Sequence, residues 1–142
     1  MIKSISHAGL SVTDMERSLK FYRDYLGMKV LMELDITDDR IARVIGIDGA
    51  KCKIVHLQHG EMVLELFEYT TPRGEKFAPK MRQCDIGFSH VGFEVSDIHT
   101  HIAELKKMGM ELLGEAVEFR PNVWVAYFKG PDGEVIEFRQ RP

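Results

Sequence analysis

Two histidines and two glutamates occupy positions from which metal-binding chemistry is expected: His7, Glu65, His90 and Glu137. Each glutamate lies between apolar neighbours in a strand-like segment, where a carboxylate is costly unless something compensates its charge. Two imidazoles and two carboxylates suit a divalent ion such as Ni²⁺, Co²⁺, Zn²⁺, Mn²⁺ or Fe²⁺. Taken singly, such residues are more often ordinary core or surface side chains, so the prediction depends on their arrangement.

The arrangement is that of an internal repeat. Residues 6–15, SHAGLSVTDM, align with residues 89–98, SHVGFEVSDI, at a constant offset of 83 positions. The segment VLEL around Glu65 resembles VIEF around Glu137. Each histidine therefore opens one copy of the repeat and each glutamate closes it. If the copies pack about a pseudo-twofold axis, equivalent positions near the axis converge, and we expect the four side chains to form one metal site.

Each copy continues from its histidine into a predicted helix. Apolar residues recur at i, i+4 and i+7, which is one face of an amphipathic helix: Met15, Leu19 and Tyr22 in the first copy, Ile98, Ile102 and Leu105 in the second. Residues 13–16 fit a capping box with Thr13 as its first member. Gly27 and Gly109 stand where glycines end helices.

Strand-like segments follow each helix. They are residues 28–31, 51–58 and 63–66 in the first copy and 110–113, 123–129 and 135–138 in the second. The predicted fold class is therefore α+β, with two pseudo-symmetric βαβββ modules in a single domain spanning residues 1–142. Module 1 covers about 3–69, a linker with Pro72, Gly74 and Pro79 covers 70–86, and module 2 covers about 87–140. Residues 38–46 have no counterpart in module 2 and are expected to form a short helix or an irregular insertion.

Composition and charge exclude several classes of function. The net charge is −3 with scattered Lys and Arg, so no nucleic-acid partner is expected. The sequence has neither an apolar stretch long enough to span a membrane nor a signal peptide, which predicts a cytoplasmic protein. Cys52 and Cys84 form no metal or disulfide motif and are expected to be reduced thiols.

The remaining histidines are weaker candidates. His99 and His101 fall off the apolar stripe of the second helix and are expected on its solvated face. His56 and His59 lie on one predicted hairpin, and a surface role at a strand end is favoured for both, with His56 pointing into the site as the alternative. For Arg120, a turn role is favoured over binding an anionic group of a substrate.

These motifs resemble those of the vicinal oxygen chelate superfamily, which includes glyoxalase I, epimerases, extradiol dioxygenases, and fosfomycin and bleomycin resistance proteins. The resemblance rests on His-x-Gly-Leu-x-Val-x-Asp followed by Phe21-Tyr22 and Leu26-Gly27, on His-Val-Gly-Phe-x-Val-x-Asp, and on Pro131-Asp132-Gly133 before Ile136-Glu137. It implies an open, cup-shaped mixed sheet with flanking helices, and His7, Glu65, His90 and Glu137 as metal ligands. The ligand set is closest to that of bacterial glyoxalase I.

The resemblance implies an isomerisation of a small substrate through a metal-chelated enediolate, with Glu65 or Glu137 as the base. Ser11 and Tyr69 stand where glutathione-contacting Arg and Asn would be, and Ser89 replaces a second histidine of the epimerases, so neither glutathione nor a CoA ester is supported. One alternative is an Fe(II) extradiol-type dioxygenase or a thiol transferase with three ligands. Another is a metal-free binding protein for a drug or metabolite, which has no need of four ligands. A homodimer is expected, since members of this length usually dimerise.

Overall fold

A computed structural model describes residues 1–76 and 80–142 of the chain. Pro79 of the predicted linker lies outside the described residues. The chain divides into two compact units, Met1–Glu75 and Lys76–Pro142, and each is described by itself below. No helix among the described residues is long and apolar enough to cross a membrane.

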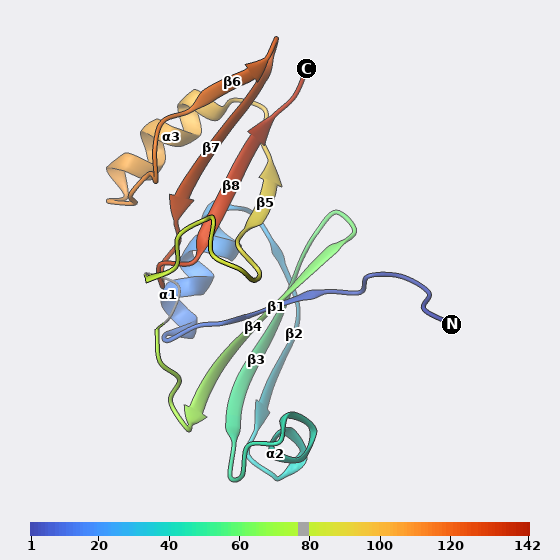
Figure 1. Cartoon of the computed structure of the whole chain (residues 1–142). Coiled ribbons are helices and arrows are strands. Elements are labelled where there is room, and N and C mark those ends of the chain that lie inside the picture. Colours follow the sequence, from blue (N-terminus) through green and yellow to red (C-terminus); the bar gives the residue numbers. More distant parts are fainter. Residues whose placement is uncertain (77–79) are drawn as a thin grey trace. The chain divides into compact units, whose positions relative to one another are not determined.

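The first unit contains one four-stranded sheet and its helices (Figure 1). In chain order its elements are β1 (Ala8–Ser11), α1 (Met15–Leu19), the π-helical continuation η1 (Lys20–Tyr25), β2 (Lys29–Ile36), α2 (Arg40–Ile45), β3 (Lys51–His59) and β4 (Met62–Thr71). The strand order is β1-β4-β3-β2, with β1 parallel to β4 and the other pairs antiparallel. Residues 38–46, expected as a helix or an irregular insertion, thus contain the helix α2.

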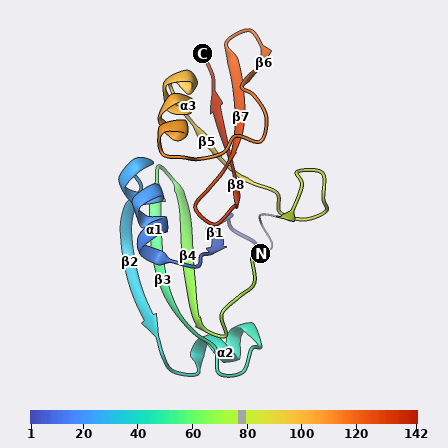
Figure 2. The same ribbon diagram turned by 90° about the vertical axis from the view of Figure 1, so that its left-hand side faces the viewer.

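The second unit repeats this design (Figure 2). Its elements are β5 (Val91–Glu94), α3 (Ile98–Lys107), β6 (Val117–Arg120), β7 (Val123–Lys129) and β8 (Val135–Gln140). The strand order is β5-β8-β7-β6, again with the first strand parallel to the last. The predicted fold class, α+β with two βαβββ modules, is confirmed.

The strand predicted at residues 110–113 forms only in part. Residues 110–113 contribute only an isolated bridge, Leu112 to Phe128, although Leu113 N–H still donates to Tyr127 and Lys129 N–H to Glu111 across it. The chain then leaves the ladder, and β6 forms only at Val117–Arg120, opposite the start of β7. The interruption falls at Gly114, a residue that weakens strands because it has no side chain to pack.

The helices α1 and α3, which follow the repeated histidine segments, are each capped by an aspartate of the repeat. Asp14 Oδ1 accepts a hydrogen bond from Arg17 N at 3.0 Å, and Asp97 Oδ1 accepts one from Thr100 N at 3.1 Å. The prediction of Thr13 as the cap was therefore wrong by one residue, since Thr13 Oγ1 instead accepts from the Arg17 guanidinium. The hydrogen bonds that Thr100 donates to Asp97 also hold the pKa of that carboxyl below its usual value.

Each helix is also tied to the last strand of its own module. The first backbone N–H of α1, at Met15, donates to Glu68 Oε2 on β4 at 2.9 Å. The first backbone N–H of α3, at Ile98, donates to Gln140 Oε1 on β8 at the same distance. Each acceptor lies three residues after a predicted metal ligand. The helix start and the glutamate-bearing strand are thus held together in both modules.

Apolar side chains on one face of each sheet form the core with its helix. Residues that are 0 to 3% exposed include Leu19, Tyr22, Leu57, Leu64 and Leu66 in the first unit, and Ile98, Leu105, Phe128, Ile136 and Phe138 in the second. Because successive strand residues point to opposite faces of a sheet, Glu65 and Glu137 each lie on the face of their own sheet that is turned away from this core. In the first unit, α2 packs part of that opposite face through Ile41, Cys52 and Ile54.

Candidate functional site

In the first module, the histidine and the glutamate of the repeat lie side by side. His7 directly precedes β1, and Glu65 lies on β4 opposite Gly9. The His7 Nε2 and Glu65 Oε2 atoms are 3.5 Å apart. The His7 side chain is 46% exposed and that of Glu65 is 14% exposed, so the pair opens to one side while its carboxylate is largely covered.

The second module has the same pair in the same register. His90 directly precedes β5, and Glu137 lies on β8 opposite Gly92. The His90 Nε2 and Glu137 Oε2 atoms are 3.0 Å apart. This pair is more deeply buried, because the side chain of Glu137 is only 6% exposed.

A serine holds the far side of each imidazole. Ser6 Oγ is 2.8 Å from His7 Nδ1, and Ser89 Oγ is 2.8 Å from His90 Nδ1. In the tautomer in which Nδ1–H donates to the serine, Nε2 carries the lone pair and faces the glutamate, as a metal ligand requires. Sequence reasoning noted the repeated Ser-His pair but missed this role.

A glycine lies opposite each glutamate in the strand register. A Cβ at Gly92 would lie 3.8 Å from Glu137 Oε2, so a larger side chain there would cover the carboxylate. Gly9 holds the equivalent place opposite Glu65. In the second module, the glycine of the His-x-Gly motif therefore keeps the space above the carboxylate open, whereas a Cβ at Gly9 would meet Phe67 at 3.6 Å.

Two further side chains contact Glu137, and neither was predicted as a site residue. Arg139 donates from Nε to Glu137 Oε1 at 3.0 Å, and its Nη2 is also 3.0 Å from that oxygen. The Tyr127 hydroxyl donates to Oε2 at 3.2 Å. Burial, and then the charge of Glu137, raise the pKa of the Tyr127 phenol, so it stays protonated as a donor. Neither residue gave a signal of this role in the sequence.

Glu65 has a different neighbour. His56 on β3 lies opposite Glu65 in the strand register, and its Nε2 is 3.4 Å from Glu65 Oε1. The alternative that His56 points toward the predicted site was the weaker one in the sequence, yet it is what the structure shows. His59, at the end of the same strand, is exposed.

The two histidines of α3 differ in how far they are exposed. His99 is exposed, although its ring lies 4.7 Å from that of Trp124. His101 is only half-buried on the helix, with its ring 5.4 Å from buried Phe138. The expectation of a solvated face therefore holds for His99 and is wrong for His101, because the apolar stripe alone did not define how wide the packed face is.

The donor atoms of each pair fit two neighbouring ligands of one ion. Two donors about 2.1 Å from an ion and about 90° apart lie about 3 Å from each other. The separations of 3.5 and 3.0 Å in the two modules are close to this value. Over the described residues, 1–76 and 80–142, no group of three or more His, Cys, Asp or Glu side chains is gathered on one point. The four-ligand site therefore stays a prediction, with one half-site in each unit.

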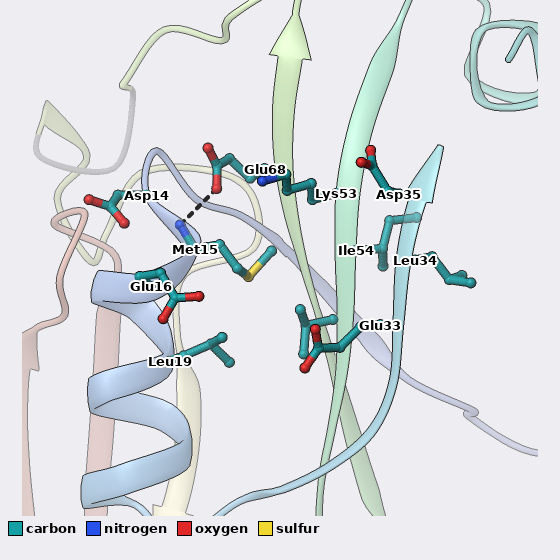
Figure 3. A pocket seen from close by; sticks show the side chains of 11 residues that line it. Asp14, Met15, Glu16, Leu19, Glu33, Leu34, Asp35, Lys53, Ile54 and Glu68 are labelled. Carbon is teal, nitrogen blue, oxygen red and sulfur yellow. Dashed lines mark hydrogen bonds between the residues drawn. The ribbon is translucent and has the colours of Figure 1, made fainter. Parts of the chain in front are cut away.

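Two cavities lie near these elements. One of about 230 Å³ adjoins Glu137 and is lined by Gly92, Phe93, Glu94, Arg139 and Arg141. The other, of about 510 Å³, lies between α1 and the strands β2 to β4 (Figure 3). It is lined by the carboxylates of Asp14, Glu16, Glu33, Asp35 and Glu68, together with Lys53 and apolar side chains. It contains no predicted ligand, because it opens on the face of the sheet away from Glu65.

Comparison with known proteins agrees with this architecture. Residues 4–138 match the family model described as the Glyoxalase/Bleomycin resistance protein/Dioxygenase superfamily. A Bacillus subtilis (strain 168) protein, YwbC, is 30% identical over 99% of this chain and all of its own length. A lactoylglutathione lyase of Neisseria meningitidis is 29% identical over 95% of this chain and 88% of its own.

Among solved structures, a glyoxalase family protein from Bacillus cereus superposes with a TM-score of 0.91 over 99% of this chain and 95% of its own, at 21% identity. This likeness shows a shared fold. Because the family model covers nearly the whole chain and the repeated modules supply its fold, the chain belongs to the Glyoxalase/Bleomycin resistance protein/Dioxygenase superfamily.

Proposed function

We propose that this chain is a divalent-metal-dependent enzyme of the glyoxalase I and epimerase type, which isomerises a small substrate. The observation that carries the proposal is the half-site repeated in both modules. Each has a serine-held imidazole whose Nε2 faces a glutamate oxygen, at 3.5 Å in one and 3.0 Å in the other. The lactoylglutathione lyase among the relatives supports the same class of reaction.

The proposed ligands are His7, Glu65, His90 and Glu137. An ion held by them would act as a Lewis acid toward two neighbouring oxygens of a substrate. Glu65 and Glu137 would then supply the carboxylate that takes a proton from a carbon next to those oxygens and returns it. Tyr127 and Arg139 orient Glu137 by hydrogen bonds, which limits how far that carboxylate can move.

The geometry of the first module favours a three-ligand site as the second candidate. The pair in the first module is the longer of the two, and Glu65 is the more exposed glutamate. If Glu65 stays off the ion, His7, His90 and Glu137 would leave more positions open, as in an Fe(II) dioxygenase or a thiol transferase.

The test joins metal binding to a substrate screen. Metal content of the purified protein and calorimetric titration with Ni²⁺, Co²⁺, Zn²⁺, Mn²⁺ and Fe²⁺ define the ion. Turnover is then screened with hemithioacetals of α-ketoaldehydes, acyl-CoA esters and catechols. A protein that binds none of these ions would overturn the proposal.

Three glutamine variants identify the roles of the glutamates. We expect Glu65→Gln to retain the metal, because an amide oxygen can still coordinate, and to lose isomerisation if Glu65 is the base. Glu137→Gln is the inactive variant under the opposite assignment. The control is Glu61→Gln, since Glu61 is exposed in the turn before β4. Catechol cleavage that Glu65→Gln carries out as fast as the unaltered protein would favour the three-ligand alternative.

A further inference from the structure

Glu65 lies between two imidazoles that come from different strands. His7 Nε2 faces Oε2 at 3.5 Å, and His56 Nε2 faces Oε1 at 3.4 Å. The side chains of His56 and Glu65 are 23% and 14% exposed, so both polar groups are mostly removed from water. Such burial is costly unless the groups compensate each other, which argues against an incidental surface histidine.

The second module has a hydrogen-bond donor at the equivalent position. Tyr127 on β7 lies opposite Glu137, as His56 on β3 lies opposite Glu65. The Tyr127 hydroxyl donates to Glu137 at 3.2 Å. The position across from the glutamate therefore carries a side chain that contacts the carboxylate in both modules, although the residue types differ.

The modules differ at the next position along the last strand. Arg139, two residues after Glu137, donates to that carboxylate. Phe67, two residues after Glu65, holds the equivalent place and has no donor to offer. Orientation of the Glu65 carboxylate therefore depends more heavily on His56 than orientation of Glu137 depends on Tyr127.

We propose that His56 is a positioning residue for Glu65, which holds Oε1 so that Oε2 is turned toward the place that His7 Nε2 faces. This inference rests on the proposed metal site and deepens it. His56 acts through the carboxylate by hydrogen bonding across the β3–β4 pair. Partners of this kind commonly change metal affinity by about 10- to 100-fold when they are removed.

The experiment uses the whole chain with Co²⁺ alone as the probe, followed by calorimetry and by the visible absorption of the bound ion. His56→Phe keeps a ring and removes the donor, so we expect about 10- to 100-fold weaker binding and a changed Co²⁺ spectrum. His56→Gln keeps an N–H donor, and its affinity should stay within a few-fold of the unaltered protein. His59→Phe is the matched control on the same strand and should change neither reading.

The contact itself is tested without metal by the imidazole signals in nuclear magnetic resonance spectra. Glu65→Gln should shift the ring signals of His56 and leave those of His59 in place. Unshifted His56 signals, or His56→Phe binding Co²⁺ as His59→Phe does, would overturn this inference alone. An equal loss in His56→Gln and His56→Phe would overturn the hydrogen-bond role. Failure of the unaltered protein to bind Co²⁺ or any of the other ions would overturn the proposed function and this inference together.

Discussion

At the level of single residues, the two proposed glutamate ligands differ in how their charges are compensated. Glu137 is contacted by the guanidinium of Arg139, a group that is always charged in proteins. Glu65 is contacted by the imidazoles of His7 and His56, which carry a charge only when protonated. Glu137 is therefore compensated even without an ion, whereas Glu65 depends on these imidazoles or on an ion.

This difference predicts the effect of replacing Arg139. Arg139→Gln removes charged donors from a carboxylate that is 6% exposed, so the free energy of unfolding should fall by about 1–3 kcal/mol in metal-free protein. A bound ion would compensate the same carboxylate, so saturating Co²⁺ should stabilise the variant more than the unaltered chain. Urea unfolding with a chelator and with Co²⁺ measures both. Arg141→Gln is the control, because Arg141 pairs with Glu94 at the surface, and an equal loss there would contradict the prediction.

A second residue-level prediction concerns the serines behind the imidazoles. Ser89→Ala removes the partner of His90 Nδ1, so the ring is no longer held with Nε2 toward Glu137. We expect about 10- to 100-fold weaker binding of Ni²⁺ in calorimetry. Ser96→Ala, at an exposed position of the same repeat, should bind normally. Equal affinities in the two variants would show that the Ser89 hydroxyl does not orient the ring.

At the level of elements, the repeat predicted more than the local signals did. The offset of 83 positions aligned both helices and both first strands, and the two sheets have the same strand order and register. The cap at Thr13 was off by one, since Thr and Asp are both good caps and only the backbone geometry decides between them. The strand predicted at 110–113 forms only a bridge to β7, because an apolar pattern alone does not show where a ladder is interrupted.

The proposed site also has residues that the repeat predicted and residues that it did not. His7, Glu65, His90 and Glu137 were predicted because symmetry made an unusual pattern visible. The contact of Arg139 was not predicted and that of His56 was only the weaker alternative, since these residues differ in type from their counterparts in the other module. Cross-strand register, which no sequence motif encodes here, brings His56 to Glu65, whereas Arg139 reaches Glu137 from two residues further along the same strand.

The tie between each helix and the last strand gives a prediction at this level. Glu68→Ala leaves the Met15 N–H without its acceptor, at 2.9 Å, and should lower the free energy of unfolding by about 1 kcal/mol. Gln140→Ala should do the same through Ile98. Chemical unfolding of both variants, with Glu61→Ala as an exposed control, measures the effect. A loss in neither variant would mean that water replaces these acceptors at no cost.

At the level of the whole molecule, each half-site holds only part of the proposed ligand set. His7 and Glu65 belong to the first unit, while His90 and Glu137 belong to the second. A complete site therefore needs one module of each kind, supplied either by one chain or by two copies of it. The oligomeric state therefore bears directly on the proposed chemistry.

We predict a homodimer. Large apolar side chains are exposed in both units, among them Leu31, Met32, Leu34, Phe88 and Phe119, and exposed apolar surface of this kind commonly marks an interface. Light scattering after size-exclusion chromatography should give twice the mass of one chain at micromolar concentration. Replacing Phe119 by Ser, with His59→Ser as a control, tests one apolar contributor. A single-chain mass for the unaltered protein would contradict the prediction.

Mixing two defective chains then shows where the site forms within such a dimer. One variant carries His7→Ala and Glu65→Ala, and the other carries His90→Ala and Glu137→Ala, so neither has the complete ligand set. If module 1 of one chain shares an ion with module 2 of its partner, the refolded mixture contains heterodimers with one complete site, and calorimetry should recover Ni²⁺ binding. If each chain closes its own site, every chain in the mixture stays defective and no binding returns. Because recovery requires an intact half-site from each chain, it also requires all four proposed ligands to act together.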